Sequence, residues 1–139
     1  MNQFQLFAHG VEFDADAYLA SAPLKFDGVW RKGDSGSSGV FKVLGDGLAL
    51  PVWEQEKIAI EFLSANREAL KALAEYPGVT TFVLGLQYCI ELDGGTFGYC
   101  IGPTARFMRH CLDIGISPYY YVTVDWDRFW AGKQDAEPS

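Results

Sequence analysis

Residues that build disulfide frameworks and metal centres are scarce in this sequence, and long apolar runs are missing. The 139 residues include three cysteines and two histidines. An odd and small number of cysteines does not make a disulfide framework, so we expect free thiols in a reducing compartment. No apolar run approaches the ~20 residues that a membrane-spanning helix needs. Residues 1–3 lead directly into a strand-like run, without the basic and apolar regions of a secretory signal. We therefore expect a cytoplasmic protein that does not act on a membrane.

Basic residues are also few. The chain holds 11 Lys and Arg against 18 Asp and Glu, which gives a formal net charge of −7. Such a charge repels phosphate backbones, so we expect no binding to nucleic acid, and it steers basic proteins towards the surface over long range. Twelve of the acidic residues lie in residues 51–139, so any negative face belongs mainly to the second half.

What the sequence does contain is a large apolar fraction. Apolar residues make up 49% of the chain, aromatic residues 15% and charged residues 21%. A chain of this length can bury roughly 68–70% of its unfolded surface, which is enough for one core. We expect a single α+β domain over residues 1–132, followed by a flexible C-terminal tail over residues 133–139.

The first half of the chain predicts three strands and a short helix. Asp14 is the expected N-cap of this helix, because Phe13 and Tyr18 occupy the two positions of a hydrophobic staple. Pro23 ends the helix, since a proline moves the residue before it out of the helical region. The strands are expected at 4–8, 26–31 and 40–44, and a loop rich in glycine and serine joins the last two.

One long amphipathic helix is expected from Gln55 to Tyr76. Polar residues recur at spacings of three and four between Lys57 and Glu75, which is the period of a helix. The opposite side is apolar and should lie on the core; it comprises Ala59, Phe62, Leu63, Leu70 and Leu73.

After this helix the pattern changes to the alternation of strands, with a hairpin turn at Gly94-Gly95. Pro103 is expected in the first turn of a third helix, and Gly115 is expected to be the left-handed residue that ends it. The strands of this half are expected at 82–92, 97–101 and 119–126. The expected apolar stripe of the third helix comprises Phe107, Met108, Cys111 and Leu112.

The order of elements is strand, helix, two strands, long helix, hairpin, helix, strand. It predicts an α+β fold with an antiparallel or mixed sheet of about six strands and three helices that cover one face. We favour an elaborated ferredoxin-like arrangement. A parallel doubly wound sheet fits less well, because hairpins are indicated.

Motifs for catalysis and for phosphate binding are incomplete. Gly33-Asp34-Ser35-Gly36 resembles the serine signature of trypsin-like proteases, but His9, the only histidine before it, lacks the sequence context that such a triad requires. Arg31 and Lys32 precede the same loop without the Gly-Lys-Ser/Thr order and the helix of a P-loop. We therefore expect no catalytic residue, cofactor or metal ion, and we interpret the segment as a hairpin loop.

Scattered thiols, imidazoles and carboxylates leave a second hypothesis open. Their spacing matches no zinc motif, and a site assembled from them by folding would make the chain a small enzyme or ligand-binding domain. The residues concerned are Cys89, Cys100, Cys111 and His110, with the acid pairs Asp14/Asp16 and Asp125/Asp127.

The candidate binding surface is the face of the final strands opposite their expected apolar, inward positions. Tyrosines supply large and rigid contact area, and acids set the polarity of an interface. The candidate partner-contacting residues are Gln87, Glu91, Tyr119, Tyr121 and Asp125. The alternative is an ordinary amphipathic sheet surface, or a surface that the first helix covers.

Two sequence segments, together with the order of the expected elements, are similar to those of a known kind of protein domain. Val11-Glu12-Phe13-Asp14 leads a short helix, and Trp30-Arg31-Lys32-Gly33-Asp34 leads a loop, before a second half of helix, hairpin, helix and strand. In these segments and in the order of its elements, the chain resembles small bacterial α+β domains. Some families of such domains are immunity proteins that bind and block a cognate toxin. The resemblance implies a non-enzymatic inhibitor, here of a basic toxin. A homodimer paired through the last strand is a further hypothesis.

Overall fold

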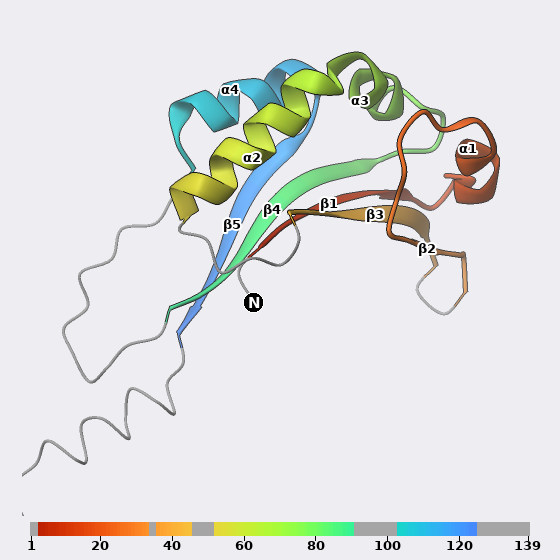
Figure 1. The fold of residues 1–139 in the computed structure, drawn as a ribbon. Coiled ribbons are helices and arrows are strands. Elements are labelled where there is room, and N and C mark those ends of the chain that lie inside the picture. Colours follow the sequence, from red (N-terminus) through yellow and green to blue (C-terminus); the bar gives the residue numbers. More distant parts are fainter. Residues whose placement is uncertain (1–2, 34–35, 46–51, 91–102, 125–139) are drawn as a thin grey trace, which may run out of the picture.

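The computed structural model describes residues 3–33, 36–45, 52–90 and 103–124, with only the backbone of 87–90 and 122–124 (Figure 1). The strands are β1 (Gln3–Gly10), β2 (Gly28–Trp30), β3 (Ser38–Leu44), β4 (Thr81–Ile90) and β5 (Ser117–Val124). The helices are α1 (Ala15–Ser21), α2 (Val52–Ala65), α3 (Arg67–Ala74) and α4 (Ala105–Ile114). None of these helices is long and apolar enough to cross a membrane.

The strands form one mixed sheet in the order β2-β3-β1-β4-β5. Neighbouring strands are antiparallel, except that β5 runs parallel to β4. From β1 to β4 the order is strand, helix, two strands, two helices and strand, and α4 and β5 follow. The α+β prediction is confirmed. Its details differ, because the described residues form five strands and four helices; the strand expected at 97–101 lies outside them.

The helix expected to run unbroken from Gln55 to Tyr76 is two helices. The break falls at Asn66, whose backbone leaves the helical region with φ −118° and ψ 20°. The Asn66 side-chain amide donates to the Phe62 carbonyl oxygen at 3.0 Å. Asparagine competes for backbone hydrogen bonds in this way, and so it favours helix ends over helix interiors.

The core lies between the sheet and the helices, which Figure 1 shows on one side of the sheet. Along β1 every second residue is buried, as expected for a strand with one covered face. The fully buried side chains include Phe4 and Leu6 of β1, Leu63 of α2, Leu73 of α3, Leu84 and Leu86 of β4 and Phe107 of α4. The apolar residues predicted to face the core from the Gln55–Tyr76 segment, which lie on α2 and α3, are buried or partly buried.

Helix ends confirm some predictions and correct others. Asp14 caps α1 by accepting from the Ala17 N–H at 3.0 Å, and Gly115 ends α4 with φ 101°. Pro103 does not begin α4: Thr104 is the N-cap, and its hydroxyl accepts from the Phe107 N–H.

The inward stripe of α4 is also rotated from the prediction. Phe107 and Cys111 are buried as expected, together with Ile114, whereas Met108 and Leu112 are exposed. An amphipathic stripe is broad enough to allow either rotation, and packing on α2, α3 and β5 decides between them.

Gly10 at the end of β1 touches the turn after α3, and this close approach gives a prediction. A Cβ at Gly10 would lie 1.8 Å from the Gly78 carbonyl oxygen, so the backbone must shift to accept it. We expect Gly10→Ala to lower the free energy of unfolding by about 1–3 kcal/mol. Urea unfolding followed by tryptophan fluorescence measures the change.

Gly33→Ala is the matched control, because a Cβ there would lie 3.8 Å from the Arg31 carbonyl oxygen, which is an ordinary van der Waals contact. Equal unfolding midpoints for the two variants would contradict this account of the β1 end.

Candidate functional site

The sheet face opposite the helices is the first candidate site, and we call it the open face. The alternation of β1 turns Gln3, Gln5, Phe7 and His9 towards it, and all four are only partly buried. The sheet register brings further side chains to this face, namely Trp30 of β2, Phe41 and Val43 of β3, Val83 of β4, and Tyr119 and Tyr121 of β5. The first helix does not cover it, because α1 lies on the side of the other helices (Figure 1).

Aromatic rings on the open face lie over glycines of the neighbouring strand. Tyr119 pairs with Gly85, Trp30 with Gly39, and Phe41 with Gly28. In each pair a ring atom lies within 2.4 Å of the place where a glycine Cβ would be. The rings therefore lean across the sheet in the space that a side chain would otherwise fill, an arrangement known as aromatic rescue of a glycine.

Phe7 and His9 join the rings of Trp30 and Phe41 into a cluster. The Phe7 ring lies 6.4 Å from that of Trp30 and 6.2 Å from that of Phe41, and the His9 ring lies 5.7 Å from that of Trp30. Such distances are typical of favourable aromatic pairs. Among the described strand residues of the open face, none is Asp, Glu, Lys or Arg.

The predicted binding residues fall on this face where the structure describes them. Tyr119 and Tyr121 are 44% and 55% exposed. Gln87 lies beside Gln3 on β1 and Tyr121 on β5 by register, so its position belongs to the same face. Glu91 and Asp125 lie outside the described residues.

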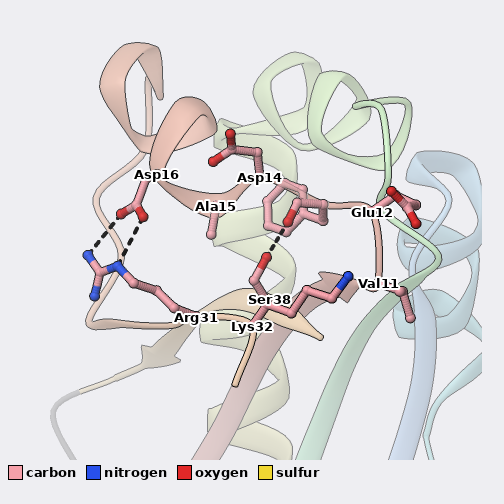
Figure 2. Close-up of a pocket in the computed structure, with 9 residues that line it drawn as sticks. Val11, Glu12, Asp14, Ala15, Asp16, Arg31, Lys32 and Ser38 are labelled. Carbon is pink, nitrogen blue, oxygen red and sulfur yellow. Dashed lines mark hydrogen bonds and ion pairs between the residues drawn. The ribbon is translucent and has the colours of Figure 1, made fainter. Parts of the chain in front are cut away.

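A cleft of about 360 Å³ lies between the start of α1 and the β2–β3 connection (Figure 2). Asp14 is occupied there as the cap of α1. Asp16 accepts from Arg31 at 2.8 and 2.9 Å, and this hydrogen bonding lowers the pKa of its carboxyl group. Ser38 donates to the Phe13 carbonyl oxygen. The Asp14/Asp16 pair, which the sequence offers for metal or acid–base chemistry, thus makes structural contacts here, and the Asp125/Asp127 pair lies outside the described residues.

A second cleft, of about 410 Å³, lies between α2 and the start of α4. Its wall contains Glu56, a carboxylate that is 6% exposed. Glu56 accepts from the Thr104 backbone N–H at 3.3 Å, from the Thr104 hydroxyl and from the Tyr120 hydroxyl. Trp53, Lys57 and Arg106 also line this cleft. Hydrogen bonds to a buried carboxylate offset the cost of its desolvation, so Glu56 joins α2, α4 and β5.

Titratable groups beside Glu56 are held in their neutral forms. Burial, and then the hydrogen bond to Glu56, raise the pKa of Tyr120 far above its usual value. Burial and the charge of Glu56 raise the pKa of the Cys111 thiol to about 12. A nucleophilic cysteine needs the thiolate form, and Cys111 has the opposite environment.

The other residues of the scattered-site hypothesis do not meet at Cys111. His110 is partly exposed on α4, and His9 lies on the open face. The structure describes no side chain of Cys89, and Cys100 lies outside the described residues. In the part of the chain that the structure covers, no three His, Cys, Asp or Glu side chains come together as a metal site.

Sequence reasoning missed the aromatic cluster and Glu56. The alternation of β1 indicated that Gln5, Phe7 and His9 share a face, but pairing with β3 and β4 was needed to place Phe41 and Tyr119 beside them. Glu56 has donors that are 48 and 64 residues away, so no local pattern marks it.

Comparison of the chain with protein-family models, with curated proteins and with solved structures finds no match. The fold and the described surface define the chain as an α+β domain whose mixed sheet is covered by helices on one face and presents aromatic side chains on the other.

The hydrogen bonds of Glu56 predict that its removal lowers the free energy of unfolding. Glu56→Ala leaves the Tyr120 and Thr104 hydroxyls without their acceptor, so we expect a loss of about 1–3 kcal/mol in the free energy of unfolding. Glu56→Gln keeps one acceptor oxygen and should cost less. Urea unfolding measures both variants; an alanine variant as stable as the parent protein would mean that these contacts do not stabilise the fold.

The Cys111 thiol predicts a pH dependence. Its pKa rises from 9.0 to about 12 on folding, so its contribution to stability is complete below pH 9 and is lost as the pH rises towards 12. Urea unfolding at pH 8 and pH 10 should show a smaller loss of stability for Cys111→Ala than for the parent protein. Alkylation by iodoacetamide at pH 8, mapped by peptide mass spectrometry, should leave native Cys111 unmodified; rapid native labelling would contradict the buried, protonated thiol.

Proposed function

We propose that this chain is a non-enzymatic protein-binding module, and that its concrete form is an immunity-type inhibitor that neutralises a basic toxin by direct binding. The observation that carries the proposal is the exposure of Tyr119 and Tyr121 on the open face. Tyrosines are enriched at protein interfaces, where they bury large area at low entropic cost. The neighbouring aromatic cluster extends the apolar area that a partner would cover.

Charge supports a basic partner. The net charge of −7 attracts a cationic protein over long range and raises its rate of association. The described part of the open face holds no charged side chain that a partner would have to desolvate. We include Gln87, Glu91 and Asp125 in the proposed interface on the alternation of the sequence, with the acids supplying local attraction.

The chemistry of the clefts supports binding over catalysis. Asp14 and Asp16 make capping and ion-pair contacts, Glu56 holds hydroxyl groups in place, and the Cys111 thiol is protonated. A general acid–base pair or an activated nucleophile needs groups poised near neutral pH. These groups instead stabilise the fold.

Affinity capture with matched variants tests the proposal. The immobilised chain should retain a basic protein from the cells that encode it, and the double variant Tyr119→Ser/Tyr121→Ser should retain at least tenfold less of it, as expected when central interface tyrosines are removed. Isothermal titration with the purified partner measures the loss.

Trp53→Ser is the control for this experiment. Trp53 is the most exposed large apolar residue in the described part of the chain, at 72%, but it lies on α2 on the other side of the sheet. The proposal requires that Trp53→Ser binds as the parent protein does. Equal capture by the double tyrosine variant and the parent protein would refute an interface on the open face.

A further inference from the structure

The ring of Tyr119 is placed to stack with a planar group. It lies over Gly85, and ring carbons Cε1 and Cζ both lie 2.4 Å from where a Gly85 Cβ would be. A ring that leans across the sheet turns one face towards the sheet and the other away from it. Because Tyr119 is 44% exposed, this outer face is accessible to a partner.

The surroundings of Tyr119 select among the groups that could stack on it. Gln5 of β1 pairs with Gly85 from the side opposite Tyr119, so Gln5 is the β1 neighbour of the glycine that the ring covers. The described strand residues next to Tyr119 on the open face include no Lys or Arg to pair with a phosphate and no carboxylate to pair with an ammonium ion. A phosphate or an ammonium ion held on the Tyr119 ring would therefore lose hydration without forming an ion pair with these neighbouring residues.

A guanidinium group does not have this difficulty. It is planar, more weakly hydrated than an ammonium ion, and attracted to the face of an aromatic ring. While it stacks, its N–H groups stay free at the ring edge, where an amide oxygen such as that of Gln5 is an acceptor. The net charge of −7 adds long-range attraction for a cation of this kind.

We propose that the open face recognises arginine side chains of its partner by stacking them on the Tyr119 ring over Gly85. The inference rests on the proposed function, because it names the partner chemistry that the same face would bind. Trp30 over Gly39 repeats the arrangement on the β2 side of the sheet and extends the surface to a second arginine.

Peptides of equal charge separate stacking from simple attraction. The probes are capped hexa-arginine and capped hexa-lysine, each titrated with the full chain at 150 mM salt and followed by fluorescence anisotropy of a peptide label. We expect hexa-arginine to bind several-fold more tightly than hexa-lysine. Equal affinities, or no binding of hexa-arginine up to millimolar protein, would overturn the proposal.

Variants then locate the preference for arginine. Tyr119→Leu keeps an apolar side chain but removes the ring, and should weaken binding of hexa-arginine by roughly 2- to 5-fold, with a smaller effect on hexa-lysine. Gly85→Ala places a methyl group under the ring and should shift the affinity in the same direction. An undiminished preference for arginine in Tyr119→Leu would overturn the assignment.

Two controls complete the test. Gly33→Ala adds a methyl group where there is room and should leave the preference unchanged. Trp53→Leu removes an exposed indole from α2 and should also leave it unchanged; loss of the preference there would assign arginine binding to the helix side and overturn the proposal. Urea unfolding midpoints for all variants separate lost binding from lost folding.

The outcomes for arginine and for the proposed function are distinguishable. A protein partner whose capture depends on Tyr119 and Tyr121, combined with equal binding of the two peptides, would refute arginine stacking alone. Capture that is insensitive to both tyrosines would refute the proposed function, whatever the peptides do.

Discussion

The register of β1 is the constraint on which the rest of the fold depends. β1 is hydrogen-bonded to β3 on one side and to β4 on the other, so it joins both halves of the sheet. Phe4 and Leu6 lie under the helices, and Gln5 and Phe7 lie on the open face. A slip of one residue would exchange these sets, placing amides in the core and large apolar groups in water. The same alternation therefore fixes the core and the candidate binding surface together.

Much of this arrangement could be predicted from local patterns. The alternation of β1, the cap at Asp14 and the left-handed Gly115 each follow from a few neighbouring residues. The errors arose where a distant contact or a subtle local competition decides the structure. Asn66 follows the end of α2, although the apolar stripe of the sequence continues past it. Thr104 caps α4, and its hydroxyl also donates to Glu56 of α2.

The candidate site likewise has a part that local patterns predict and a part that depends on distant contacts. Alternation along the last strand placed Tyr119 and Tyr121 on one face, and both are exposed there. The neighbours of these tyrosines depend on strand pairing: the adjacency of β2, β3 and β1 brings Trp30, Phe41 and Phe7 together. The glycines opposite the aromatic residues look, in sequence, like weak points of strands. In the sheet they make room for rings.

The two sides of the sheet differ in their charged groups: the helix side contains a buried carboxylate, and the described strand residues of the open face include no Asp, Glu, Lys or Arg. This difference is relevant to the proposed binding of a partner by an acidic chain. On the helix side, Glu56 is buried and supplied with hydrogen-bond donors that join α2, α4 and β5. On the open face, the described side chains are aromatic, aliphatic or uncharged polar groups. Net charge acts over several ångströms through solvent, whereas desolvation acts at contact. Under the proposed function, a partner can therefore be attracted by the whole chain and still dock beside described strand residues that carry no charge of their own. Stacking on aromatic rings is the interaction that suits such a surface, because it accepts a cation without requiring a buried carboxylate.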